Sequence, residues 1–149
     1  MKRIAATALL TFALAACETT GIGPAAPPPV AIAAGELDLG DYRGASEAAT
    51  LQAFQQNAAA RYVAGVRLDA AMADLSSQQF NCSDAPELDN GRGDPPVQVC
   101  RRTLTQNNCT HTWQVHLYDN SGDGMLTRTR GLYDRRCGNE GLLGGPGGG

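Results

Sequence analysis

The sequence lacks several features that mark common enzyme classes and nucleic-acid-binding proteins. It contains no G-x-S-x-G, no H-E-x-x-H and no Gly-rich phosphate loop. Lysine occurs only at Lys2, and acidic residues outnumber basic residues by 15 to 12. An acidic chain offers no electrostatic reason to bind nucleic acid. These absences predict a protein that is not an enzyme, needs no cofactor and has no nucleic-acid partner.

Long hydrophobic runs are also lacking, except for a short one at the start of the chain. "MKRIAATALLTFALAAC" places two basic residues before an apolar run that is too short to span a bilayer. It ends in "LAAC", which resembles the lipobox of bacterial lipoproteins. We therefore expect a signal peptide over residues 1–16, lipidation of Cys17, and a membrane anchor that holds the protein on the periplasmic side of the cell envelope. An ordinary signal peptide with an incidental cysteine is the alternative. Glu18 in place of an aspartate favours the outer membrane.

Two segments have the composition of flexible chain. Residues 17–45 are rich in Gly, Ala and Pro and show no sustained periodicity, which predicts a flexible linker. Residues 138–149 are dominated by glycine, which predicts a disordered tail. The folded domain is then expected over residues 46–137, which is small for a single hydrophobic core.

Two helices are expected at the start of this domain. Residues 46–65 carry apolar side chains at steps of three or four, with Ser46 as a plausible N-cap and Gly65 as a stop. A second, shorter helix is expected from residue 68, capped by Asp69. The apolar residues of the two helices are Leu51, Phe54, Ala58 and Tyr62 in the first, and Leu68, Met72 and Leu75 in the second.

From Phe80 onwards the periodicity changes from helical to alternating. Strands are expected at residues 80–82, 97–104, 111–118 and 125–133. The order of the elements predicts an α+β fold in which two N-terminal helices pack on one face of a three- to four-stranded antiparallel sheet.

The same order of segments resembles the BamE (SmpA/OmlA) family of lipoproteins and the β-lactamase-inhibitor-like fold. The resemblance covers roughly residues 60–137 and consists of "YVAG", the short helix "RLDAAMADLSSQQF", a following cysteine, the hairpin strand "TWQVHLYD" and a last strand that ends in Cys137. It implies a protein-binding module, in the best-known case an accessory of outer-membrane protein assembly.

Four cysteines lie within the expected domain and predict two disulfides. An oxidising compartment and a small core both favour such bonds. If the last hairpin turns about Gly122, residues whose numbers sum to about 244 face each other, which brings Cys109 within reach of Cys137 and leaves Cys82 for Cys100. A zinc site is the poorer alternative, because the chain has no C-x2-C pair, and His111 and His116 fall on opposite faces of a strand. No metal ligand is predicted.

The stretch "YDNSGDGMLTRTR" resembles the start of a calcium loop. Asp119, Ser121 and Asp123 stand at the offsets of an EF-hand, but Arg130 occupies the twelfth position, where a bidentate carboxylate is required. Asn, Ser, Gly and Asp are also the residues that hairpin turns favour. We interpret the stretch as a turn, with weak calcium binding as the alternative.

A candidate binding face follows from the expected hairpin. In the register that sums to 244, His116 lies opposite Arg128 and Gln114 opposite Arg130, all facing solvent, while Trp113 and its inward neighbours face the core. Arginine often anchors protein interfaces, so these four outward residues are the predicted partner-binding site. The loop from Ser83 to Pro96 is the next candidate.

The predicted function is therefore a small protein-binding or envelope-assembly accessory module, anchored in the membrane and bound to a protein partner in the cell envelope. A structural envelope lipoprotein with no single strong partner is an alternative. Catalysis by an acid–base pair of His116 and Asp119 is a third reading, although a histidine on a sheet surface is more often merely solvated.

Overall fold

The structure is a computed structural model, and it describes residues 28–85 and 94–138. The predicted signal peptide, the lipidation site Cys17 and most of the predicted tail lie outside the described residues. Within the described part, no helix is long and apolar enough to cross a membrane.

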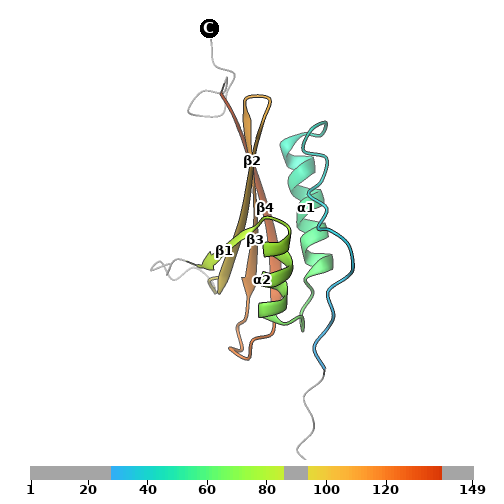
Figure 1. Ribbon diagram of the computed structural model, residues 1–149, viewed down its shortest axis with the longest axis vertical. Helices are drawn as coiled ribbons and strands as arrows, with labels where there is room; N and C mark the ends of the chain where they lie inside the picture. Colours follow the sequence, from blue (N-terminus) through green and yellow to red (C-terminus); the bar gives the residue numbers. More distant parts are fainter. Residues whose placement is uncertain (1–27, 86–93, 139–149) are drawn as a thin grey trace, which may run out of the picture.

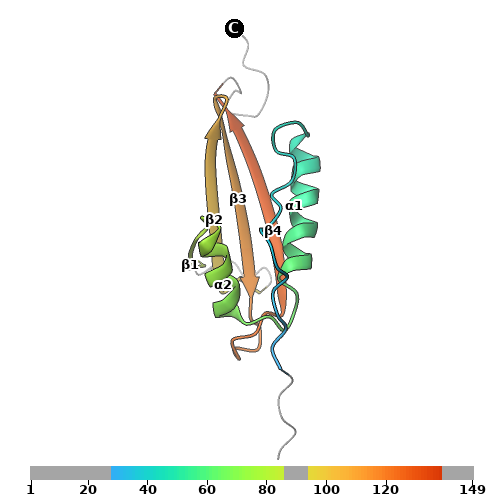
Figure 2. The same ribbon diagram turned by 45° about the vertical axis from the view of Figure 1, so that its right-hand side comes forward.

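The fold is α+β, as predicted, with two helices and one open antiparallel sheet of four strands (Figure 1). The strands lie in chain order, β1-β2-β3-β4. Both helices cover the same face of the sheet, with α1 along β4 and α2 beside β1 and β2 (Figure 2). The elements are α1 Glu47–Arg61, α2 Leu68–Ser77, β1 Asn81–Asp84, β2 Gln98–Gln106, β3 Cys109–Tyr118 and β4 Arg128–Cys137.

Helix α1 begins and packs as its sequence predicts. The Ser46 hydroxyl accepts a hydrogen bond from the Ala49 amide, so Ser46 is the N-cap. Phe54 and Ala58 are fully buried against the sheet. Gly131 of β4 allows a close approach, because a Cβ atom there would lie 3.0 Å from Cδ1 of Phe54 and 3.1 Å from its carbonyl oxygen.

The predicted cap of α2 is wrong by two positions. The N-cap is Arg67, and it makes no capping hydrogen bond with its side chain. Asp69 lies within the first turn, where its carboxylate accepts from the Ala70 amide and pairs with the guanidinium of Arg67. A carboxylate in that turn still interacts favourably with the positive end of the helix dipole.

The packed unit begins earlier than residue 46, so the predicted flexible linker does not extend over its last part. Leu37 is only 5% exposed, and the indole Nε1 of Trp113 donates to the Leu39 carbonyl oxygen at 3.1 Å. Tyr42 packs edge-on against Trp113, with 5.0 Å between the ring centroids. The segment before α1 therefore packs on the domain, with Leu37 in the core and Ile32, Leu39 and Tyr42 partly buried against it.

The hairpin of β3 and β4 has a register that sums to 246, two residues from the predicted one. The expected last strand, residues 125–133, begins only at Arg128, because residues 124–126 pair with the connection between the helices instead. The Leu126 amide donates to the Val66 carbonyl at 2.8 Å, and Leu126 itself is buried. A shift of two residues moves partners along the strands but leaves every side chain on its predicted face.

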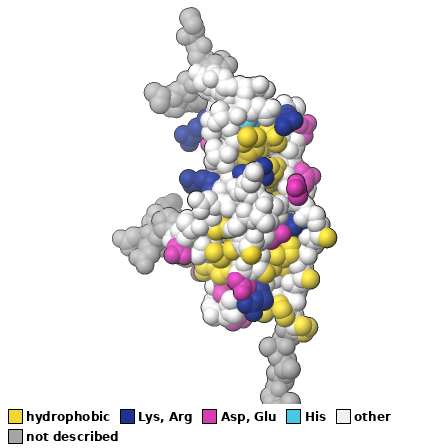
Figure 3. Space-filling model, in the orientation of Figure 1, with side chains coloured by type: hydrophobic (Ala, Val, Ile, Leu, Met, Phe, Trp, Pro, Cys, Tyr) yellow, Lys and Arg dark blue, Asp and Glu magenta, His cyan; other side chains and the backbone are white. Residues whose placement is uncertain are grey.

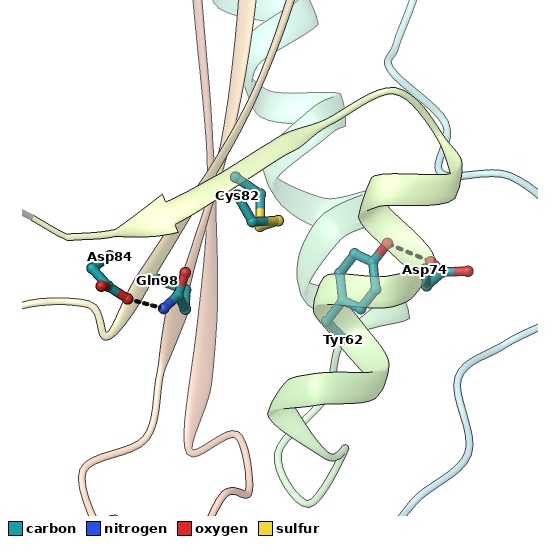
Figure 4. Close-up of a disulfide and its surroundings, with 6 residues drawn as sticks. Tyr62, Asp74, Cys82, Asp84 and Gln98 are labelled. Atoms are coloured by element: carbon teal, nitrogen blue, oxygen red, sulfur yellow. Dashed lines mark hydrogen bonds between the residues drawn. A yellow bond between two sulfur atoms is a disulfide. The ribbon is translucent and has the colours of Figure 1, made fainter.

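The two disulfides join the predicted pairs, Cys82 with Cys100 and Cys109 with Cys137. Each links directly opposite residues on neighbouring antiparallel strands. In Figure 4 the Cys82–Cys100 disulfide lies on the side of the strands that faces α2 and the hydrogen bond between Tyr62 and Asp74.

Candidate functional site

The candidate site lies on the face of the sheet that the helices leave uncovered. Trp113 and Val115 of β3 are fully buried under the helices, so the alternating residues Gln114 and His116 point to the opposite face. Two rows of side chains cross the four strands on that face. Their members are Ser83, Val99, His116 and Arg130 in one row, and Asn81, Arg101, Gln114 and Leu132 in the other.

A cavity of about 780 Å³ opens on this face. Its volume falls within the range of small-ligand sites, roughly 300–1,000 Å³. One wall is formed by the chain segments that flank the connection between β1 and β2, including Ala85, Pro95 and Pro96. The cavity therefore combines both predicted candidates, the outer face of the hairpin and the ends of the loop from Ser83 to Pro96.

Three arginines line the cavity: Arg101 of β2, and Arg128 and Arg130 of β4. All three are exposed. Within the part of the chain that the structure describes, none of them pairs with a carboxylate, because the ion pairs there are Arg61–Asp74, Arg67–Asp69 and Arg136–Asp134. Asp94 is the single acidic residue among the described residues of the lining, so these residues carry an excess of positive charge.

His116 lies on β3, between the strand that carries Arg101 and the strand that carries Arg130. Partial burial, and after it the positive charges of Arg130 and Arg101, lower the pKa of His116 below its ordinary value. The imidazole is therefore neutral at pH 7, and its Nε2 lies 3.4 Å from Oε1 of Gln114. The hydrogen-bond partner is an amide and not a carboxylate, so the predicted alternative of a His116–Asp119 pair is not formed.

Arg128 and Tyr118 lie opposite each other on β4 and β3, and both line the cavity. The guanidinium carbon of Arg128 lies 3.8 Å from the centre of the Tyr118 ring, in a cation–π contact. Its Nη2 donates a hydrogen bond to the carbonyl oxygen of Asp94, with 3.4 Å between the two atoms. The Asp94 carboxylate accepts from Nδ2 of Asn120 at 3.1 Å, which links the cavity wall to the turn after β3.

The turn after β3 uses its acidic side chains internally. The carboxylate of Asp119 accepts from the amides of Gly122 and Gly124, at 2.7 and 2.8 Å, and Asp123 accepts from the Met125 amide. Burial alone would raise the pKa of Asp119, but the Gly124 and Gly122 amides outweigh it and hold that pKa below its usual value. Gly122 and Gly124 both have positive φ, as tight turns require. Among the described residues, no group of three or more His, Cys, Asp or Glu side chains is placed to hold a metal ion.

All four predicted partner-binding residues line the same cavity, but the residues opposite them on the neighbouring strand differ from the predicted ones. Arg130 lies opposite His116, Arg128 lies opposite Tyr118, and Gln114 lies opposite Leu132. Arg101 was not among the residues predicted from the sequence. In the structure Cys100 is fully buried, so its neighbours in the alternating strand face outwards, and one of them is Arg101.

The helix-bearing side of the molecule has a different character. In the orientation of Figure 3, apolar side chains reach the surface between charged ones on the side where α2 lies. Several hydrophobic residues that pack against the core are only partly buried, among them Tyr42, Met72 and Leu104. The arginine-lined cavity lies on the opposite face of the sheet, among the outward side chains of the strands.

Comparisons with protein-family models, with curated proteins and with solved structures found no match to this chain.

Proposed function

We propose that this chain is a lipid-anchored protein of the cell envelope whose folded domain binds a protein partner through the arginine-lined cavity. The observation that carries the proposal is the cavity itself, in which three guanidinium groups face solvent without a carboxylate partner among the described residues. Arginine side chains of this kind are over-represented at the energetic centres of protein interfaces.

The proposed location rests on the N-terminal sequence and on the cysteines. The basic start, the short apolar run and "LAAC" support lipidation of Cys17 and anchoring at the outer membrane on its periplasmic side. Two disulfides support an oxidising compartment, where such bonds persist. The resemblance to the BamE family supports a role in binding other envelope proteins.

Affinity capture from detergent-solubilised membranes tests the binding role. The double variant Arg128→Glu with Arg130→Glu should lose the captured partner, while its circular dichroism and urea midpoint stay close to those of the parent chain. Arg43→Glu with Arg67→Glu is the matched control, because it makes the same charge change at exposed residues outside the cavity. Equal capture by both double variants and the parent would place the binding surface elsewhere.

Lipidation has a separate test. Cys17→Ser should remove the acyl chains, which intact-mass measurement detects, whereas Ala16→Ser keeps a small residue before the cysteine and should retain them. An unchanged lipid mass in Cys17→Ser would contradict the proposed anchor.

A further inference from the structure

We infer that the cavity binds the carboxylate groups of an acidic peptide in an extended conformation, with Arg101 and Arg130 as the residues that hold a carboxylate. This inference rests on the proposed function, because it names the chemistry of the partner at the same site.

The charge of the cavity selects an anion. Among the described residues, three arginines and one aspartate line it, and the carboxylate of that aspartate, Asp94, accepts a hydrogen bond from Asn120. A guanidinium group presents five donors in a planar fork that matches a carboxylate, and it is more weakly hydrated than an ammonium group. A ligand carboxylate therefore finds donors in the cavity that no described acidic side chain occupies.

Two of the arginines lie on the strands to either side of His116. Arg130 lies directly beside His116 on the neighbouring strand, and Arg101 lies one row along on the other side, beside Gln114. The positive charges of both arginines, after partial burial, lower the pKa of His116, as expected for cations on the strands to either side of it. An anionic group above His116 would thus face two cations and a neutral ring.

The remaining walls suit a peptide better than a bare anion. Asn81, Ser83 and Gln114 offer hydrogen-bond donors and acceptors for backbone amides, and Val99 and Pro96 supply apolar surface. In an extended peptide, residues i and i+2 share a face and lie about 6.5–7 Å apart, which is also the spacing of same-face residues along β3 and β4. The arginines line a cavity rather than a projecting surface, which suits an inserted segment better than the plane of a membrane.

Calorimetric titration of the full chain in detergent micelles tests the inference. The probe is acetyl-Gly-Glu-Val-Glu-Gly-amide, which places both glutamates on one face. The control peptide has glutamine at both positions, and glycerol 3-phosphate at equal ionic strength represents a lipid headgroup. We expect saturable binding of the Glu peptide, at least about tenfold tighter than binding of either control ligand.

Substitutions locate the binding. Arg101→Gln and Arg130→Gln should each weaken binding of the Glu peptide about tenfold. Arg136→Gln is the matched control, because Arg136 also lies on β4 but pairs with Asp134 outside the cavity. It should leave the affinity unchanged, and binding of the Glu peptide should weaken as salt is added.

Three results would overturn the inference. The first is equal binding of the Glu and Gln peptides. The second is binding of glycerol 3-phosphate as tight as that of the Glu peptide, which would assign the cavity to phosphates. The third is that the parent chain does not bind the Glu peptide, although it captures a partner that the Arg128→Glu, Arg130→Glu variant loses. In that case the proposed function would stand without this ligand.

Discussion

The side chains of Arg61 and Asp74 meet in a two-point ion pair that joins the end of α1 to the middle of α2. Nε of Arg61 donates to Oδ2 of Asp74 at 3.0 Å, and Nη2 donates to Oδ1 at 2.9 Å. The Tyr62 hydroxyl and the Gln78 amide also donate to Oδ2, at 2.6 and 2.9 Å. Nη2 of Arg61 donates further to the Gly35 carbonyl oxygen. One carboxylate thus connects both helices, and through Arg61 the N-terminal segment.

Removal of this carboxylate should destabilise the fold strongly. The Arg61 side chain is only 7% exposed, so Asp74→Ala leaves a mostly buried charge without its partner. We expect a loss of about 3 kcal/mol in the free energy of unfolding, measured by urea denaturation. Asp69→Ala is the control, because Asp69 pairs with Arg67 in an exposed ion pair on the same helix, and such pairs contribute little. Equal urea midpoints for the two variants would contradict the role given to Asp74.

The features that sequence reasoning predicted are those set by local periodicity. Alternation placed Trp113 inwards and His116 outwards. The cysteine pairs followed from a hairpin about Gly122, and an error of two residues in its register still left Cys109 within reach of Cys137. The register itself depended on a non-local contact. Residues 124–126 pair with the connection between the helices, and no pattern within the hairpin shows that.

The N-terminal segment could not be predicted for a related reason. Its Gly, Ala and Pro content is typical of a tether, yet Leu37 and Leu39 lie against the core that the sheet and helices build. Composition describes what a segment does alone, whereas docking depends on a surface made by distant residues. The Arg61–Asp74 ion pair could not be predicted for the same reason, since its two residues lie 13 positions apart on different helices.

The docking of this segment can be measured through Leu37. Leu37→Ala should lower the free energy of unfolding by about 2–4 kcal/mol, because the side chain is 5% exposed and its removal leaves a cavity in the core. Val30→Ala is the control, since Val30 is 46% exposed and should tolerate the change with little loss. If Leu37→Ala is as stable as Val30→Ala, the segment is a tether after all.

The close approach of α1 to β4 predicts that an alanine at Gly131 lowers the free energy of unfolding, whereas such a change inside a strand usually raises it. Replacing a glycine inside a strand with alanine normally stabilises it, and Gly131 does not have a positive φ that would forbid the change. The new methyl group would nevertheless meet the backbone of α1 at Gln55 Cα and at the Phe54 carbonyl oxygen, both at 3.1 Å. Gly131→Ala should therefore cost about 1–3 kcal/mol in urea denaturation. A more stable variant would show that α1 can move aside.

Acidification below about pH 6.5 should destabilise the fold, because both histidines have lowered pKa values. Burial, and after it Arg135, lowers the pKa of His111, whose Nδ1 lies 2.7 Å from the Tyr133 hydroxyl. Burial, and after it Arg130 and Arg101, lowers the pKa of His116, which faces Gln114. Below a pH of about 6.5, the ordinary value for histidine, the unfolded chain therefore binds more protons than the folded one.

The sign of the effect follows from this difference in bound protons. The stability that the neutral histidines contribute is complete above pH 6.5 and is lost progressively as the pH falls through the lowered folded-state pKa values. Urea midpoints should be flat from pH 8 to 7 and then decrease towards pH 5. His116→Gln should remove part of that decrease, because glutamine keeps a polar side chain beside Arg130 and Arg101 but takes up no proton. Midpoints that stay level or rise between pH 7 and pH 5 in the parent chain would contradict the lowered pKa values of the two histidines.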